Sequence, residues 1–407
     1  MIVAAVRSTQ ITVMLSLLAC GCAQSAGNRE AAAAPRMSVR MADSTMARHP
    51  NPALMEDPEP EWRYSSSFAV HAIARLGVES GQQKYLDYAR KYMEPFVDEQ
   101  GRVSHESYDP KKYRLDDVVP GRVLLLLYDQ TRDEKLLVGP RQLAEQLKTQ
   151  PRTKDGGYWH KQIYPHQLWL DGIFMDCPFM VEFATRANEP QWHDEAVNQI
   201  LTIAKHTRDP KTGLFYHGYD ESRGEKWANQ ETGTSQCFWG RAVGWYALGI
   251  VETLRTLPPD HPRRGDVLDV FRGLAEAITK VQDEKTGLWW QVLDQPNRAG
   301  NYLESSASSM FVYSLAAGAR QGYLDRKYAA VARRGYEGML AQFIEIDPAS
   351  GNVSLKDTCQ VAGLGGRPYR DGSYAYYIRE PRISNDPKGV APFILAAMEM
   401  ERAPKRD

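Results

Sequence analysis

Five short segments rich in Asp, Pro and Gly recur along the chain and separate pairs of helix-like stretches. Each combines a turn, whose Gly is free to adopt positive φ, with a short strand-like stretch after it. Successive turn glycines lie 55, 57, 74 and 64 residues apart, the length of two helices with their loops. The repeat therefore predicts a tandem array of helical hairpins. The turn glycines are Gly101, Gly156, Gly213, Gly287 and Gly351.

Between the turns, apolar residues recur at three- and four-residue steps, which is the spacing of one helix face. Over residues 118–128 the Val and Leu positions cover most of the helix circumference, as expected of a buried inner helix. No comparable stretch alternates apolar and polar residues as a sheet strand does. Helices are expected at 65–79, 84–95, 119–130, 134–148, 168–186, 190–205, 239–256, 266–281, 305–320, 325–343 and 388–401.

An array of helical hairpins either stays open as a solenoid or closes into a ring. Solenoid repeats are shorter, roughly 34 to 47 residues, and need polar caps. The longer repeat therefore predicts an all-α fold, an (α/α)6 barrel of six hairpins in a single domain over residues 56–407. In a closed ring the repeated turns gather at one mouth, where a site is expected. Residues 23–55 have no sustained period and are expected to be a flexible tether.

The first 22 residues are typical of an export signal. Arg7 precedes an apolar run over 11–19 that is too short to span a membrane. Residues 17–20 (LLAC) resemble a bacterial lipobox, in which Cys20 is acylated; cleavage further along the chain would give a soluble exported protein instead. Either route predicts a periplasmic or envelope-anchored protein, attached to the membrane only through a lipid on Cys20.

Composition limits the partners. A formal net charge of -1, without basic clustering, argues against nucleic acid. The 9 Trp and 21 Tyr suit a carbohydrate ligand, because aromatic faces pack against the apolar face of a sugar ring, but such residues also fill large cores. Composition leaves both interpretations open and indicates no oligomeric state.

Three cysteines lie in the body of the chain, an odd number without metal-ligand spacing. One disulfide plus one thiol, or three buried thiols, are the alternatives. The apolar or small neighbours of each favour three buried thiols. The residues are Cys177, Cys237 and Cys359.

Asp116 and Asp171 each follow a turn glycine by 15 residues, at the expected start of an inner helix. The equal offset is expected to place both carboxylates side by side at the mouth. Paired carboxyls in different environments are typical of glycosidic chemistry. Each could instead be a helix N-cap. For Asp171, the neighbouring Trp169 and the apolar residues 173–175 favour a desolvated catalytic carboxyl.

Residues 237–246 (CFWGRAVGWY) are dense in aromatic and small residues around Arg241. In a helix, Arg241 and Trp245 share a face, and Gly240 and Gly244 are expected to open space beside them. Arg suits a bidentate grip on a carboxylate and Trp suits a sugar face. The alternative is an aromatic core helix whose Arg caps a carbonyl.

His160 and His217 each follow a turn glycine by four residues, which is expected to place both rings at the same mouth. There they either contact a ligand or have a structural role.

Four motifs follow one another along the chain: LDDVVPGR at 115–122, HQLWLDG at 166–172, FYHGYD at 215–220 and FWGRAVGWY at 238–246. With SNDPKG at 384–389, they resemble the unsaturated rhamnogalacturonyl hydrolases, glycoside hydrolase family 105, over about residues 60–400. The resemblance implies an (α/α)6 barrel, an oligosaccharide substrate, and a reaction without metal or other cofactor. It also implies that Asp171 is the general acid/base, that Asp116 assists it, and that His160, His217, Trp239, Arg241 and Trp245 line the substrate site.

The family's substrates carry a 4,5-unsaturated uronic acid at the non-reducing end, left there by a polysaccharide lyase. The enzyme protonates C4, water adds at C5, and the hemiketal opens to release the sugar. One carboxyl serves as acid and then as base, so it must begin protonated, a state that burial or a neighbouring carboxylate favours. Arg241 would balance the substrate carboxylate. Asp176 and Cys177 depart from the small, uncharged residues usual here, which could alter the preferred leaving sugar.

The expected substrates are thus fragments of pectin or rhamnogalacturonan. Unsaturated glucuronyl hydrolases acting on glycosaminoglycan fragments share the fold and chemistry and are the nearest alternative. An inverting hydrolase or a sugar epimerase on the same barrel is another, although an epimerase is expected to use a His pair. A non-catalytic, sugar-binding surface lipoprotein would need the Trp and Arg residues but not Asp171.

Overall fold

The computed structural model describes Met1 and residues 36–402 of the 407-residue chain. The predicted export signal, with Cys20, and the first part of the predicted tether lie outside the described residues. No helix in the described part is long and apolar enough to cross a membrane.

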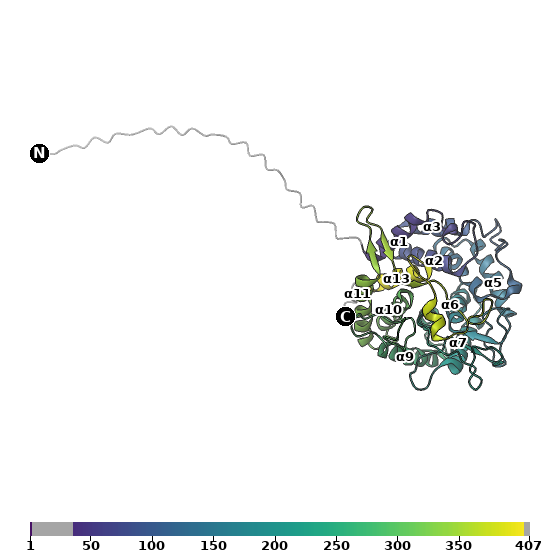
Figure 1. The fold of residues 1–407 in the computed structure, drawn as a ribbon. Helices are drawn as coiled ribbons and strands as arrows, with labels where there is room; N and C mark the ends of the chain where they lie inside the picture. The colour runs from purple at the N-terminus through teal and green to yellow at the C-terminus, as the bar shows by residue number, and fades with distance from the viewer. Residues whose placement is uncertain (2–35, 403–407) are drawn as a thin grey trace. The chain divides into compact units, whose positions relative to one another are not determined.

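Six inner helices form a closed ring (Figure 1). Each contacts the next along the chain, and the last contacts the first, so the ring has no open edge. The expected (α/α)6 barrel is confirmed. The inner helices are α2 (Tyr64–Ser80), α4 (Gly121–Thr131), α6 (Leu170–Ala187), α8 (Gly240–Thr256), α10 (Ser305–Arg320) and α13 (Pro387–Met400).

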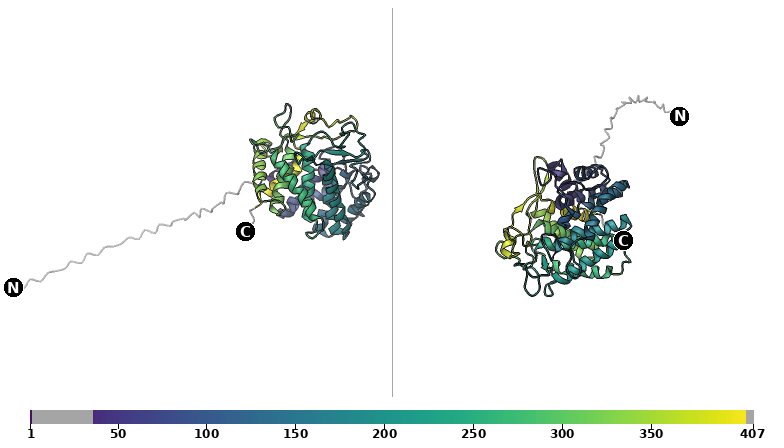
Figure 2. Two further views of the ribbon diagram at one scale, coloured as in Figure 1. Left: turned by 90° about the horizontal axis from the view of Figure 1, so that it is seen from below. Right: turned by 90° about the vertical axis from the view of Figure 1, so that its right-hand side faces the viewer.

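Six outer helices surround the ring, and each packs against at least one inner helix (Figure 2). The inner helices bury most of their residues, whereas the outer ones bury one face, in keeping with an apolar stripe turned to the core. The outer helices are α3 (Gln83–Met93), α5 (Val138–Lys148), α7 (Gln191–Thr207), α9 (Arg264–Lys280), α11 (Lys327–Gln342) and α1 (Met37–Arg48).

The predicted tether is wrong from residue 37 onward, because α1 packs against α13 and belongs to the barrel. Its buried face is largely small and polar, so it lacks the apolar period that marks the other helices. Ser38 binds the Glu401 carboxylate, and the Ser44 hydroxyl accepts from the backbone N–H of Val353, 2.8 Å away. These hydrogen bonds satisfy side chains that the sequence pattern alone assigns to solvent.

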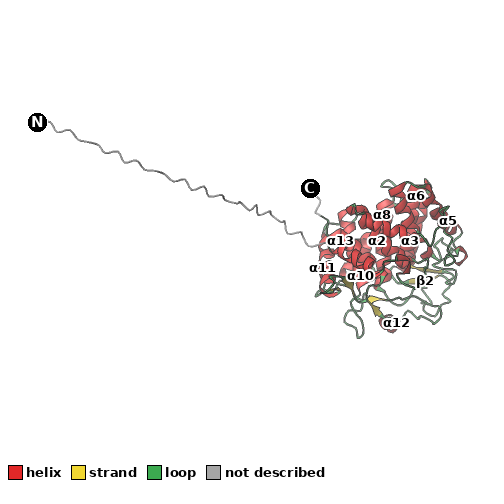
Figure 3. Ribbon diagram, turned by 90° about the horizontal axis from the view of Figure 1, so that it is seen from above, coloured by secondary structure: helices red, strands yellow, loops and turns green. Residues whose placement is uncertain are grey.

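The repeated turns lie at the mouth where the inner helices begin. All five turn glycines have positive φ, between 73° and 96°, as predicted. Figure 3 shows the loops, β2 and α12 gathered on one side of the helical body. The short helices are α12 (Tyr374–Arg379) and the 3₁₀ helices η1 (Pro52–Leu54), η2 (Pro110–Lys112), η3 (Leu115–Val118) and η4 (Glu134–Leu137). Three short antiparallel strand pairs are β1 (Gln167–Trp169) with β2 (Gly218–Asp220), β3 (Ile344–Ile346) with β4 (Val353–Leu355), and β5 (Thr358–Cys359) with β6 (Arg382–Ile383).

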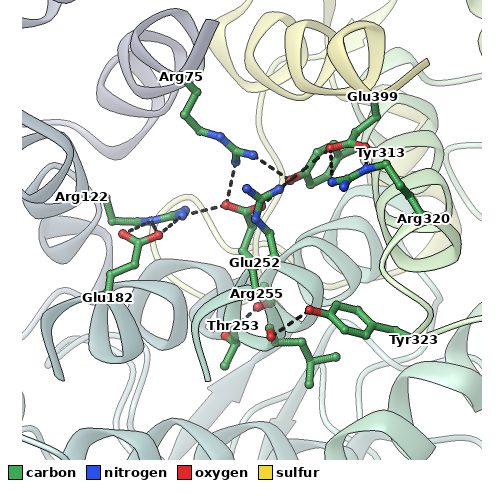
Figure 4. A network of polar contacts seen from close by, with 12 residues as sticks. Arg75, Arg122, Glu182, Glu252, Thr253, Arg255, Tyr313, Arg320, Tyr323 and Glu399 are labelled. Atoms are coloured by element: carbon green, nitrogen blue, oxygen red, sulfur yellow. Dashed lines mark hydrogen bonds and ion pairs between the residues drawn. The ribbon is translucent and has the colours of Figure 1, made fainter. Parts of the chain in front are cut away.

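At the opposite end of the ring, Glu252 of α8 joins several inner helices through a buried ion network (Figure 4). Its carboxylate lies 2.8 Å from the guanidinium groups of Arg75 on α2 and Arg122 on α4, and it accepts a hydrogen bond from Tyr313 on α10. Burial alone raises the pKa of Glu252, but the Arg residues outweigh it and hold this pKa well below its usual range.

The three body cysteines are buried free thiols, as the sequence favours.

Candidate active site

Asp171 is the second residue of α6, directly after β1. Its side chain does not cap the helix, because Trp169 occupies the N-cap position; the N-cap alternative is therefore wrong for Asp171. The side chain is 13% exposed, and Oδ2 is buried without a hydrogen-bond partner. A carboxylate oxygen held in this way is costly unless something else binds it.

His217 reaches Asp171 through the pairing of β1 with β2. The register sets Trp169 opposite Gly218, and the N–H of Leu170 donates to the carbonyl of His217 at 3.0 Å. The His217 ring is fully buried, with Nε2 3.2 Å from Asp171 Oδ2. Two successive repeats thus deliver one acid and one imidazole to the same point.

Asp116 lies in η3, in an environment unlike that of Asp171. Its Oδ2 is 2.6 Å from Lys161 Nζ, and its Oδ1 is 3.5 Å from His160 Nε2. Arg114 is the N-cap of η3, so the N-cap alternative is wrong here too. Burial alone raises the pKa of Asp116, but Lys161 and His160 outweigh it and keep this pKa below its ordinary value. Asp116 is therefore an ionised, paired carboxylate.

The two predicted histidines both contact Trp169. His160 stacks on the indole with ring centroids 4.7 Å apart and an interplanar angle of 15°, and His217 meets it edge-on at 5.4 Å. Burial lowers the pKa of His160 to about 4, against smaller opposing effects of Asp116 and Asp171, so the ring is neutral near neutral pH. His160 and Trp169 thus lie between the two carboxylates.

Trp239 and Arg241, at the start of α8, form the adjoining wall. The Trp239 ring lies 4.8 Å from that of His217, and the Arg241 guanidinium lies 4.9 Å above the indole. Arg241 donates to the carbonyls of Cys359 and Gln360, but Nε has no partner. No carboxylate pairs with Arg241 among the described residues, so this buried cation is suited to bind an anion.

Trp245 lies one turn deeper on α8 than Arg241 and does not join this wall. Its ring stacks on Phe174 at 4.7 Å and contacts Phe68 at 5.5 Å and Tyr64 at 6.2 Å. It supports the mouth from within the barrel, and its contact with substrate stays a prediction.

The glycines beside Arg241 do not open space, contrary to the sequence interpretation. A Cβ on Gly240 would lie 2.9 Å from the Trp290 carbonyl oxygen, and one on Gly244 would lie 2.8 Å from Met310 Sδ. They let α8 approach its neighbours closely.

Asp176, the departure noted in the sequence, lies in the contact between α6 and α7. With Tyr158 and Gln199 it lines a cavity of only about 10 Å³ behind Trp169. Burial, reinforced by Glu195, raises the pKa of Asp176 to about 7. The structure therefore places this carboxyl in the helix packing rather than beside Asp171.

A cavity of about 720 Å³ lies between the starts of α2 and α13. Tyr64 and Gln360, which also neighbour Asp116 and Arg241, connect it to the wall described above. Its lining mixes cations and carboxylates: Arg48, Glu56, Asp57, Arg63, Asp386 and Lys388. Two nitrogens of Arg48 are buried without a partner.

The arrangement places, among the described residues, a carboxyl without a Lys or Arg partner and an Arg without a carboxylate partner beside aromatic rings. A family model of glycosyl hydrolase family 88 matches residues 37–404. The chain belongs to glycosyl hydrolase family 88. It is therefore a glycoside hydrolase.

Known proteins similar to this family 88 hydrolase include members of family 105. The structure of a family 105 glycoside hydrolase from C. acetobutylicum ATCC 824 is 40% identical with a TM-score of 0.86, covering 90% of this chain and 99% of that one. The unsaturated rhamnogalacturonyl hydrolase YesR of Bacillus subtilis is 27% identical over 278 residues, 66% of this chain and 75% of its own. The resemblance drawn from the four motifs is confirmed.

The unsaturated glucuronyl hydrolase of Bacillus sp. GL1, described as responsible for the degradation of glycosaminoglycan, shares the fold alone. It is 13% identical with a TM-score of 0.66, covering 90% of this chain and 95% of that one.

Sequence reasoning missed two polar residues of this family 88 hydrolase that touch the predicted ones. Lys161 directly follows His160, so its position in the repeat was the available signal. Tyr377, whose hydroxyl lies 2.7 Å from His217 Nδ1, comes from a segment without periodicity and gave no signal. Within the described ranges no three His, Cys, Asp or Glu side chains are grouped as metal ligands.

Proposed function

We propose that this family 88 hydrolase removes a 4,5-unsaturated uronic acid from the non-reducing end of lyase-generated pectin or rhamnogalacturonan fragments. The observation that carries the proposal is the Asp171 carboxyl, which is mostly buried, lacks a cation, and lies beside His217. The second support is Arg241, a buried guanidinium without a carboxylate partner. Together they match a substrate that needs one proton donor and one binding group for its own carboxylate.

In the proposed reaction, Asp171 begins protonated. Its O–H bond breaks as the C4=C5 π electrons form a C4–H bond, which leaves positive charge at C5 shared with the ring oxygen. Water then forms the C5–O bond and returns a proton to the Asp171 carboxylate. The resulting hemiketal opens by cleavage of the bond between C5 and the ring oxygen, and the hemiacetal at C1 expels the remaining sugar as an alcohol.

Asp116 assists as a fixed negative charge. Since Lys161 keeps it ionised, its carboxylate can stabilise the positive charge that develops at C5, without itself moving a proton. Two carboxyls in unlike environments thereby serve two roles. Arg241 orients the substrate carboxylate, and the buried Trp169 and Trp239 rings hold His160, His217 and Arg241 in place.

We further propose that the cavity beside Tyr64 and Gln360 receives the rest of the oligosaccharide. Its volume of about 720 Å³ is within the range of ligand pockets. Arg48, with two unpartnered nitrogens, favours a leaving chain that carries an acidic group.

The test is turnover of unsaturated oligosaccharides prepared with different lyases, followed by the loss of ultraviolet absorbance of the conjugated chain end. We expect the highest kcat/KM with rhamnogalacturonan fragments. Higher kcat/KM with glycosaminoglycan disaccharides would replace the substrate class while keeping the reaction. Tight binding without turnover on every substrate would instead favour the sugar-binding alternative.

The sequence of the first 22 residues supports a second proposal, that the enzyme is exported and acylated on Cys20. A lipid label should be incorporated into the full chain and lost in Cys20→Ser. A soluble periplasmic enzyme without label would show cleavage further along the chain.

A further inference from the structure

The Tyr377 hydroxyl lies 2.7 Å from Nδ1 of His217, on the side of the ring opposite Asp171. Tyr377 belongs to α12, which lies between β5 and β6, and the two residues are 160 positions apart. Both side chains are fully buried. The contact therefore joins the segment over the mouth to the imidazole beside the proposed acid.

The direction of this hydrogen bond follows from what each atom can do. Within the described chain, His217 Nδ1 is the one hydrogen-bond partner of the Tyr377 hydroxyl. If Nδ1 carried the ring proton, the hydroxyl hydrogen would be buried without an acceptor, which is costly. Burial raises the pKa of Tyr377 well above its ordinary value, so the hydroxyl keeps its proton. The hydroxyl therefore donates and Nδ1 accepts.

When the imidazole holds a single N–H proton, that proton is therefore on the opposite nitrogen, Nε2. His217 Nε2 lies 3.2 Å from Asp171 Oδ2, and neither atom has a hydrogen-bond partner in the described chain. A neutral imidazole has one donor and one acceptor, and the bond made by one nitrogen fixes the role of the other.

We propose that Tyr377 is a positioning residue for Asp171, holding His217 as the tautomer whose Nε2–H lies beside Oδ2. The catalytic part of this proposal rests on the proposed function. With Oδ2 beside the imidazole N–H, Oδ1 is the oxygen that moves the proton. The Oδ1–H bond breaks as C4–H forms, and the proton of the attacking water returns to Oδ1. The positive end of the Nε2–H group, 3.2 Å from Oδ2, stabilises the carboxylate that exists between these two events.

Gln291 fixes the Tyr377 ring independently of its hydroxyl. The Gln291 amide donates to the carbonyl of Tyr377 at 3.0 Å, and its Oε1 accepts from the Trp239 indole N–H at 3.1 Å. Trp239 in turn stacks on the Tyr377 ring, with centroids 5.8 Å apart and an interplanar angle of 22°. A change that removes only the hydroxyl should therefore leave the ring in place.

Tyr377→Phe is the test, and Tyr376→Phe is its matched control. Tyr376 is the neighbouring residue of the same helix, and its hydroxyl accepts from the N–H of Gly363 at 3.0 Å rather than contacting His217. We expect Tyr377→Phe to lower kcat by about tenfold or more, as removal of a group that orients a functional His does, with KM within about twofold. Tyr376→Phe should keep kcat within about twofold of the wild-type value.

A readout without substrate separates this inference from the proposed function. In ¹⁵N-histidine-labelled protein, the His217 signals, assigned by their absence in His217→Asn, should show Nε2 protonated and Nδ1 unprotonated. In Tyr377→Phe the population should move toward Nδ1–H, whereas Tyr376→Phe should leave it unchanged. Wild-type protein with the proton on Nδ1 would overturn the inference whatever the enzyme hydrolyses.

A double variant tests whether Tyr377 acts through His217. In a His217→Asn background, Tyr377→Phe should cause no further loss of kcat, because the tautomer no longer exists to be held. An additive loss of kcat would show that Tyr377 acts independently of His217 and would overturn the proposal. If the wild-type enzyme turns over no unsaturated oligosaccharide, the proposed function fails, and the tautomer measurement alone decides the arrangement inferred here.

Discussion

Lys161 Nζ lies 2.6 Å from the Asp116 carboxylate, whereas no Lys or Arg of the described residues pairs with Asp171, whose neighbour is His217. The two carboxyls at the mouth therefore differ in environment although they occupy the same offset in consecutive repeats. Asp116 is held ionised by its cation, and no Lys or Arg of the described chain holds Asp171 in the same way. This asymmetry is the basis of their proposed division of labour.

Lys161→Met should make activity fall on the acidic side of the pH profile. Burial alone raises the pKa of Asp116, and without the ammonium this effect is no longer outweighed. In the wild type, the lowered pKa keeps the Asp116 carboxylate charged down to low pH. In Lys161→Met, the pKa of Asp116 is higher, so on acidification the carboxylate loses its charge at a higher pH than in the wild type. We expect kcat/KM to decline at mildly acidic pH. Lys154→Met, at an exposed lysine of the same turn, should leave the profile unchanged; an unshifted profile for Lys161→Met would contradict the role of Asp116.

Arg241→Gln should weaken recognition of the substrate carboxylate. Charge-assisted hydrogen bonds support a loss in kcat/KM of about 10- to 100-fold. A substrate esterified on the unsaturated uronic acid should lose a similar factor with the wild type but little with the variant. Equal sensitivity of both enzymes to esterification would show that Arg241 binds something else.

Glu252→Gln should destabilise the barrel without touching the chemistry. Removing this charge leaves Arg75 and Arg122 without their shared buried partner, and breaking a buried pair costs about 3–5 kcal/mol in the free energy of unfolding. Denaturant unfolding should show this loss of free energy of unfolding, whereas the folded variant should keep its kcat. Glu276→Gln, which removes an exposed carboxylate of α9, is the control and should leave the unfolding midpoint unchanged. An unchanged midpoint for Glu252→Gln would contradict the structural role of the network.

The Glu252 network should also weaken in acid. Because the pKa of Glu252 is held well below its usual range in the folded state, its stabilisation is complete above the ordinary carboxyl pKa. It is lost as the pH falls through the lowered folded-state pKa. The wild type should therefore lose more stability on acidification than Glu252→Gln does, measured as the difference in unfolding midpoints.

Activity should survive exhaustive chelation. The proposed steps use only Asp171, water and fixed charges, and no described group of side chains has the arrangement of metal ligands. Turnover that disappears with a chelator and returns with a divalent cation would show a metal requirement.

The sequence predicts the ring well because its signals are local. Helical period and turn glycines repeat, and equal offsets from Gly156 and Gly213 bring His160 and His217 into contact with one indole, that of Trp169. The sequence pattern does not predict helix α1, because its buried face is largely small and polar. Its buried Ser38 and Ser44 form hydrogen bonds with partners more than 300 residues away.

The site was harder to predict where it depends on contacts between distant segments. Tyr377 meets His217 across 160 residues, and nothing in the pattern of its short helix distinguishes it from Tyr376. The prediction that Gly240 and Gly244 open space beside Arg241 was also wrong. In sequence, a glycine that allows close helix packing cannot be distinguished from one that leaves room for a ligand.

The turnover of Asp171→Asn tests the central claim most directly. The amide nearly preserves the shape but can neither protonate C4 nor activate water, and general acid–base catalysis of this kind contributes about 10² to 10⁴ in rate. The variant should fold normally, bind substrate within about tenfold of the wild type, and lose at least about a hundredfold in kcat. Asp176→Asn, a second buried Asp of α6 that lies away from the mouth, should keep its turnover. An Asp171→Asn enzyme that hydrates its substrate at near the wild-type rate would remove Asp171 from the mechanism and leave Asp116 as the remaining candidate.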